Sequence, residues 1–270
     1  FEAESSAALG FGFRCGFLGL LHMEIIQERL HREYNLGVIS TTPSIIYKVH
    51  DKIGKTKEVD NPVKYPEPQN IEYVEEPFVK VYLMFPKDYL GDMMELCKSR
   101  RGEFVSTEFL DTEKVQIIFE MPLSEIITDF YDKVKSLTSG YGSLDYELID
   151  YRATDIVKLD ILINGEICDA LGSLVHRDKA QFKGRSLVKK LKEEIPRHLF
   201  KIALQAAVGG KIIAREDISA VGKNVTGKCY GGDITRKRKL WAKQKEGKKK
   251  MKQFGKIQIP QKAFLAALKA

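Results

Sequence analysis

The sequence has few cysteines, and they are widely separated. Among 270 residues there are only Cys15, Cys97, Cys168 and Cys229, and no two of them form a CxxC pair. This spacing argues against a disulfide scaffold and against a zinc ribbon or zinc finger. The five histidines also lack metal-ligand spacing, so we expect no metal site. A reducing, cytosolic compartment is the simplest interpretation.

Long apolar runs are also absent, and we expect no signal peptide. No apolar stretch approaches the roughly 20 residues needed to cross a bilayer. The chain begins Phe1-Glu2-Ala3-Glu4, without an initiator Met, a basic start or an apolar core, so we expect a piece of a longer protein. Its 43% hydrophobic and 30% charged residues are typical of a globular protein, and its length suggests two or three domains.

Nucleotide-binding motifs are incomplete wherever they begin. Gly54-Lys55-Thr56 resembles the end of a phosphate-binding loop, but the required earlier glycine would stand at position 49, which is Val49. No Asn-Lys-x-Asp string occurs, and the spacing of Gly10 and Gly12 fails the dinucleotide pattern at Cys15. We therefore expect no catalytic residues and no bound nucleotide or other cofactor on this chain.

The net charge of +7 hides a segregation along the sequence. Residues 1–227 contain 30 Lys and Arg against 35 Asp and Glu, whereas residues 228–256 contain 12 basic and only 2 acidic residues. A mildly acidic body followed by a strongly basic segment points to a polyanionic partner that binds the basic segment.

The basic segment also contains the only tryptophan of the chain. A ring can stack on an unpaired base while the surrounding cations neutralise phosphates, so the combination favours nucleic acid. A solubilising tail or an anionic membrane surface remains an alternative. The predicted RNA-binding residues are Lys228, Arg236, Lys237, Arg238, Lys239, Trp241, Lys243, Lys245, Lys248, Lys249, Lys250 and Lys252.

Two further groups of basic residues are weaker candidates for RNA contacts. His176 and Arg177 follow an expected strand, and Arg185 lies shortly after them. Arg100 and Arg101 precede Gly102 at the end of an expected helix, where capping that helix is the more economical explanation.

The hydrophobic pattern predicts an α+β chain of several domains. Over residues 77–152 the order strand, helix, strand, strand, helix, strand indicates a ferredoxin-like βαββαβ domain. Residues 1–50 have one helix and a few strands, which suits half of a second ferredoxin-like domain. We expect a linker or an extended inter-domain strand over 51–76 because it is rich in proline and charge. Residues 153–270 form an α+β unit with a basic, flexible segment at 228–259.

Three stretches carry a family resemblance. Residues 8–30 and residues 76–142 are similar to domains III and V of translational GTPases related to elongation factor G. The most specific stretch is the C-terminal one, because elongation factor G has no such domain. It resembles the elongation factor 4 (LepA) family through Lys228-Cys229-Tyr230-Gly231-Gly232-Asp233-Ile234-Thr235-Arg236-Lys237-Arg238-Lys239-Leu240 and Gln244-Lys245-Glu246-Gly247-Lys248-Lys249-Lys250-Met251-Lys252.

The resemblance implies the C-terminal part of a ribosome-dependent GTPase. It places GTP and Mg²⁺ in a domain that this chain lacks, and it names the 70S ribosome, rRNA and tRNA as partners. The implied activity is back-translocation and fidelity on stalled or mistranslocated ribosomes under stress, with a role in ribosome assembly as another reading. It also implies a cytoplasmic location with possible peripheral membrane association. We expect a monomer in solution.

Two rival functions remain open at this point. A ferredoxin-like hydrolase of the acylphosphatase type would need an asparagine at its phosphate cradle, and residues 77–152 contain none. A structural spacer with a solubilising basic tail would bind no ribosome through that tail.

Overall fold

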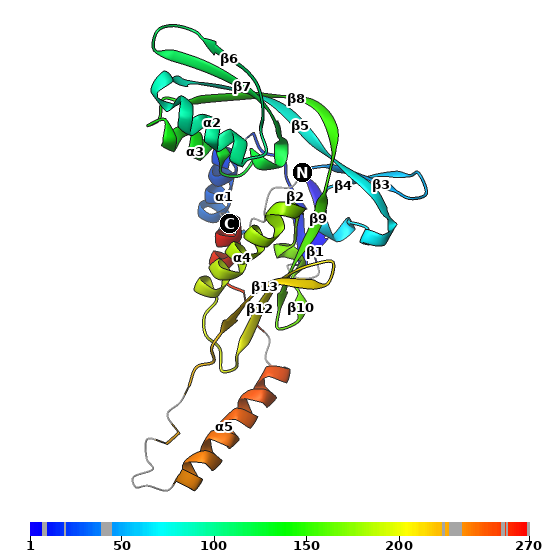
Figure 1. Ribbon diagram of the computed structural model, residues 1–270. Helices are drawn as coiled ribbons and strands as arrows, with labels where there is room; N and C mark the ends of the chain where they lie inside the picture. The colour runs from blue at the N-terminus through cyan, green and yellow to red at the C-terminus, as the bar shows by residue number, and fades with distance from the viewer. Residues whose placement is uncertain are drawn as a thin grey trace.

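The computed structural model describes residues 1–6, 10–18, 20–38, 45–222, 225–226, 234–254, 257 and 259–268. Within these ranges the chain forms three antiparallel sheets and six α-helices, arranged along an extended molecule (Figure 1). Lys228 and the residues around it lie outside the described residues.

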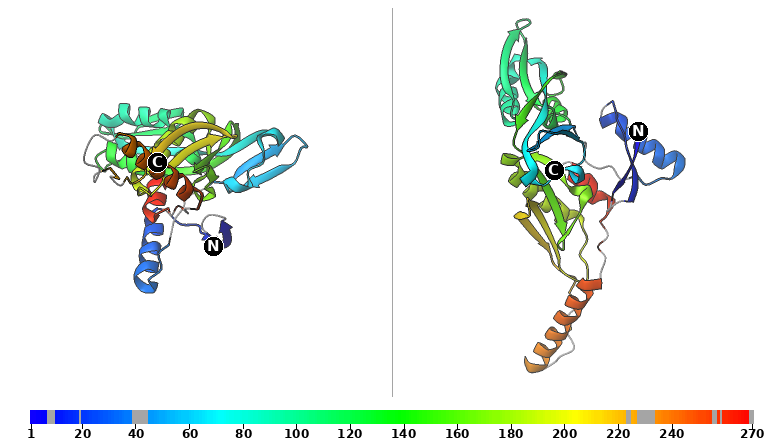
Figure 2. Two further views of the ribbon diagram at one scale, coloured as in Figure 1. Left: turned by 90° about the horizontal axis from the view of Figure 1, so that it is seen from below. Right: turned by 90° about the vertical axis from the view of Figure 1, so that its right-hand side faces the viewer.

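The N-terminal part is a hairpin followed by a helix. Strands β1 (Glu2–Ser6) and β2 (Gly10–Arg14) pair with each other alone, and α1 (Leu20–Tyr34) follows. Figure 2 shows this part beside the larger sheets rather than within them. Arg14 ties the hairpin to the body through an ion pair with Asp60 and a 2.7 Å hydrogen bond to the Asp60 carbonyl.

The ferredoxin-like domain forms as predicted. Its strands pair in the order β8-β5-β7-β6, with α2 and α3 packed on one face. Alternate residues of β5 (Val79, Val81, Leu83 and Phe85) are buried on that face because successive side chains in a strand point to opposite sides. The elements are β5 (Ile71–Pro86), α2 (Leu90–Ser99), β6 (Glu103–Phe109), β7 (Lys114–Pro122), α3 (Phe130–Leu137) and β8 (Ser143–Thr154).

The segment expected to be a linker or an extended inter-domain strand has regular structure, and its last residues begin strand β5. Strand β4 (Thr56–Val59) pairs with β3 (Tyr47–Asp51), and β3 pairs in turn with the first residues of β5. Two of its three prolines, Pro62 and Pro68, open short 3₁₀ turns at Pro62–Lys64 and Pro68–Asn70, between β4 and β5, where proline needs no backbone donor. β3, β4 and β5 therefore extend the ferredoxin-like sheet across the boundary expected at residues 76 and 77.

The C-terminal unit is a sheet covered by two helices. Asn164 and Gly165 form a tight turn, both with positive φ, and Gly209 and Gly210 form a second one. A 3₁₀ helix at Asp169–Leu171 precedes the strand that ends at His176. The elements are β9 (Ile156–Ile163), β10 (Glu166–Ile167), β11 (Ser173–His176), α4 (Arg177–Glu194), β12 (Ile202–Val208), β13 (Lys211–Ile218) and α6 (Gln261–Leu268).

Helix α6 completes the core of this unit although it lies beyond the basic segment in the sequence. Ala263 and Phe264 are buried in the same apolar cluster as the inward residues of β9, β12 and α4. A separate small cluster joins this unit to the larger sheet, since Ile156 of β9 packs with Tyr47 and Val49 of β3. The Tyr65 hydroxyl donates a 2.8 Å hydrogen bond to the Ile156 carbonyl at the same place.

Candidate nucleic-acid interface

The basic segment, which we expected to be flexible, is described over most of its length as a helix, α5 (Ile234–Phe254). The composition explains the helix. Lys, Arg, Gln, Leu and Met all have high helix propensity, and the β-branched residues Ile234 and Thr235 stand only at its start. Glu246 adds a 3.0 Å ion pair to Lys250, one turn further along.

Helix α5 projects away from the rest of the molecule. It lies beyond the ends of β12 and β13 and points outward in both views that show its length (Figures 1 and 2). A helix that is polar on all sides gains little from packing, so its exposed position follows from its sequence. The helix therefore presents its side chains to solvent rather than to the body.

The electrostatics of α5 are strongly positive. It carries ten Lys and Arg residues against the single acid Glu246, and each of the ten is exposed or partly exposed. At about 1.5 Å per residue, these charges lie along a rod of roughly 30 Å. Trp241 stands among them with 54% of its surface exposed. One carboxylate leaves this field largely uncompensated, which suits binding to a polyanion.

Most of the predicted RNA-binding residues are thus brought together on one element. Lys228 belongs to the same predicted set but lies outside the described residues. The residues that α5 carries are Arg236, Lys237, Arg238, Lys239, Trp241, Lys243, Lys245, Lys248, Lys249, Lys250 and Lys252.

The candidates near residue 176 lie at a different place, the first turns of α4. The His176 ring accepts a 3.3 Å hydrogen bond from the Asp178 backbone and caps the helix. Arg177 is paired with Asp155. Arg185 is exposed on the same helix. His176 and Arg177 therefore have structural partners within the chain, and Arg185 is the one turned to solvent.

Arg100 and Arg101 are held by carboxylates at the junction between the two larger units. Arg100 lies 2.7 Å from Asp129, and Arg101 lies 2.6 Å from Glu76, whose side chain is fully buried. Both arginines also contact Glu125, at 3.7 and 3.2 Å. These contacts give the two side chains a structural role in holding the junction together. The sequence had indicated only that they cap the end of a helix.

Lys179 links the two units directly, a role that the sequence does not indicate. From α4 it donates a 2.8 Å hydrogen bond to Glu125 and a 3.1 Å hydrogen bond to the Ser99 carbonyl at the end of α2. Lys183, one turn further, is largely buried, and this burial lowers the pKa of its ammonium group. No local pattern signals these contacts, because the partners are 54 and 80 residues away in the sequence.

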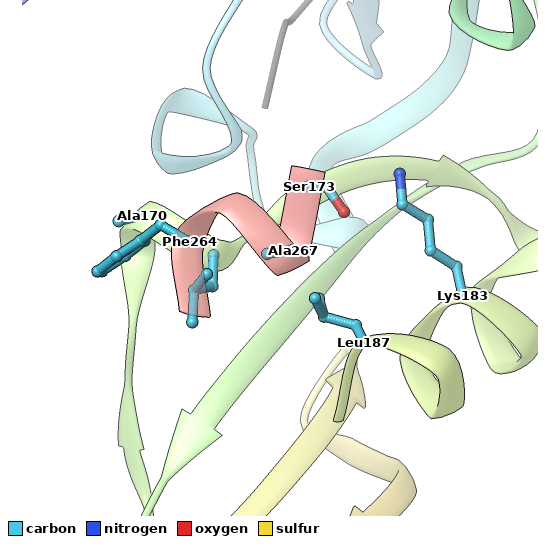
Figure 3. A pocket seen from close by; sticks show the side chains of 7 residues that line it. Ala170, Ser173, Lys183, Leu187, Phe264 and Ala267 are labelled. Atoms are coloured by element: carbon cyan, nitrogen blue, oxygen red, sulfur yellow. The ribbon is translucent and has the colours of Figure 1, made fainter. Parts of the chain in front are cut away.

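A small cavity beside Lys183 does not provide a substrate site. It lies between α4 and α6 and is lined mainly by apolar side chains, with Ser173 and Lys183 at its edge (Figure 3). Its volume of about 10 Å³ holds one water molecule at most. Among the described residues, no three His, Cys, Asp or Glu side chains are grouped to hold a metal ion. No helix in those residues is long and apolar enough to cross a membrane.

Comparison with protein families identifies the two larger units. Residues 73–162 match the family model described as "Elongation factor G C-terminus", and residues 163–269 match "GTP-binding protein LepA C-terminus". Together with the ferredoxin-like sheet, these matches define the chain as the C-terminal part of a translation factor. The acylphosphatase alternative is not favoured.

Individual relatives narrow the class further. The chain is 60% identical over 269 residues to elongation factor 4 of Alkaliphilus oremlandii, covering 100% of this chain and 45% of that protein. It is 58% identical to elongation factor 4 of Geobacillus thermodenitrificans and 57% identical to that of Bacillus subtilis, in each case over 100% of this chain and 44% of the relative. The chain belongs to the elongation factor 4 family and spans less than half the length of these relatives.

Proposed function

We propose that this chain is the ribosome-binding part of an elongation factor 4, and that α5 is its principal RNA contact. The observation that carries the proposal is a helix with ten exposed or partly exposed cations and an exposed tryptophan, held away from a body of mildly acidic composition. Cations along α5 neutralise phosphates of rRNA or tRNA and release counterions. Trp241 stacks on an unpaired base.

The remaining activity of the family belongs to the whole protein in this proposal. GTP and Mg²⁺ bind in a domain outside this chain, and the GTPase acts on stalled or mistranslocated ribosomes to promote back-translocation and fidelity. The chain works as a monomer in the cytoplasm, associated with ribosomes. The body holds α5 in place for this task, because α6 follows α5 in the sequence and anchors it to the core through Phe264.

Salt-dependent co-sedimentation with 70S ribosomes tests the proposal. The variant replaces all ten cations of α5 by glutamine, which preserves helix propensity. Deleting residues 228–270 is unsuitable, because that would also remove the buried Phe264. If about six phosphates are contacted, wild-type affinity falls by about 10³ or more between 50 and 200 mM salt.

The outcomes separate the proposal from its rival. Loss of binding together with a flattened salt slope in the glutamine variant supports α5 as the RNA contact. Unchanged binding in that variant would favour a structural spacer with a solubilising segment. In that case Arg185 on α4 would be the next candidate for an RNA contact.

A further inference from the structure

The cations of α5 form two opposite faces rather than one. Successive residues of an α-helix are rotated by about 100°, so residues three, four, seven or eleven apart share a side. One side, which we call the broad face, also contains Trp241. Its cations are Lys237, Arg238, Lys245, Lys248, Lys249 and Lys252. The opposite side, the narrow face, contains Arg236, Lys239, Lys243 and Lys250.

Two uncharged or acidic seams separate these faces. Leu240, Gln244, Gly247 and Met251 follow one another at helical spacing along one seam. Thr235, Ala242 and Glu246 form the other seam. The single acid of the helix therefore lies between the two basic faces, and neither face is interrupted by a carboxylate.

We infer that α5 binds two phosphate backbones at once, one against each face. This inference rests on the proposed function and specifies its ligand as a cleft between two RNA backbones. A helix lying on a single RNA surface or an anionic membrane would direct the opposite face into solvent. With its side chains the helix is about 10–12 Å across, which exceeds the Debye length of about 8 Å at 0.15 M salt. Cations on the far face would then contribute little to binding.

The position of Trp241 means that the two faces bind different features of the RNA. The tryptophan lies amid the six cations of the broad face and is 54% exposed. The broad face therefore meets a backbone with an unpaired base beside it, because stacking needs a free base plane. Along the stretch that holds its four cations, residues 236–250, the narrow face has no aromatic residue, and there it meets phosphates alone.

Two matched triple variants test the inference. K237Q/K245Q/K252Q removes three charges from the broad face, and K239Q/K243Q/K250Q removes three from the narrow face. The control K57Q/K98Q/K211Q removes three exposed charges from the body. Co-sedimentation with 70S ribosomes is measured for each variant in a salt series centred on 0.15 M, and far-UV circular dichroism checks that the helix is retained.

If both faces of α5 bind phosphates, the two α5 triple variants weaken binding to a similar extent. Each α5 triple flattens the logarithmic salt slope by about three and weakens binding about 10-fold or more, because each lysine accounts for about one phosphate contact. The control triple retains the wild-type slope. If one α5 triple behaves like the control, the two-backbone inference is overturned while the proposed function stands. If both α5 triple variants behave like the control, the two-backbone inference and the proposed function are both overturned.

Discussion

At the scale of single residues, Glu76 is the most constrained charge in the described part of the chain. Its side chain is fully buried in β5, where Arg101 donates hydrogen bonds of 2.6 and 3.1 Å and the Ser124 hydroxyl one of 3.1 Å. Burial by itself would lower the pKa of Arg101, but the Glu76 and Glu125 carboxylates raise it above its ordinary value. A buried carboxylate is tolerated only with such partners.

Replacing Arg101 by methionine therefore destabilises the fold. Arg101→Met leaves the Glu76 charge buried without its main partner, and we expect a loss of about 3 kcal/mol in the free energy of unfolding, measured by urea denaturation. Arg29→Met is the matched control, because Arg29 forms an exposed pair with Glu33 on α1 and solvent-exposed ion pairs contribute little to stability. Equal effects of the two substitutions would refute the assigned role of Glu76.

The cysteines should differ sharply in reactivity. Cys15 is exposed, whereas Cys97 is fully buried in α2, and this burial raises the pKa of its thiol to about 12. Only the thiolate reacts with alkylating reagents, and at pH 8 about one Cys97 thiol in 10⁴ is ionised. We expect iodoacetamide at pH 8 to modify Cys15 and spare Cys97 until the chain is denatured, as read by mass spectrometry. Similar rates at both sites in the native protein would contradict the burial of α2.

At the scale of elements, α5 depends on intrinsic propensity more than any other described helix, because it stands away from the core. Gly247 lies at its middle, and a Cβ added there would meet nothing within 4 Å. Glycine costs about 1 kcal/mol relative to alanine inside a helix. If α5 binds RNA as proposed, part of the energy of binding is therefore spent on ordering this helix.

Substituting Gly247 tests whether α5 binds as a helix. Gly247→Ala should increase helix content by circular dichroism and raise RNA affinity by about two- to fivefold, since 1 kcal/mol corresponds to about a fivefold change. Gly247→Pro should do the reverse, because proline interrupts a helix interior. Weaker binding by the alanine variant would mean that the segment contacts RNA in another conformation.

The elements also show what the sequence could predict. The ferredoxin-like order was predictable because α2, β5 and β7 each bury alternating or helically spaced apolar residues. Helix α5 was not predicted because a helix without an apolar stripe has no hydrophobic period, although the residues that we propose to bind RNA could be listed from charge alone. The sequence of the first half of β5 is typical of a linker because Glu72, Glu75 and Glu76 interrupt its apolar pattern. The burial of Glu76 could not be predicted, because it depends on an arginine 25 residues away.

At the scale of the whole molecule, Glu125 connects the two larger units. It accepts hydrogen bonds from Arg101 within the ferredoxin-like domain and from Lys179 of the C-terminal unit. Only 8% of its surface is exposed, so these interactions are poorly screened by solvent. This carboxylate therefore helps to set the direction in which the C-terminal unit presents α5.

Neutralising Glu125 should loosen this connection. Glu125→Gln leaves Arg100, Arg101 and Lys179 close together without a shared carboxylate, and we expect destabilisation of about 2 kcal/mol or more. Calorimetry should resolve two unfolding transitions where the wild type shows one. Glu113→Gln, at an exposed pair with Lys87, serves as the control. A single unshifted transition in the Glu125 variant would contradict the role of the junction.

The central claim, that α5 is the element that touches RNA, is tested most directly by the fluorescence of Trp241, the single tryptophan of the chain. Its emission, excited at 295 nm, therefore reports on α5 alone. A hairpin RNA with an unpaired loop is titrated into the chain, and a mobility-shift assay on the same samples records binding independently. We predict that emission is quenched in proportion to binding and recovers as salt is raised. Binding in the mobility shift with unchanged tryptophan emission would contradict the claim.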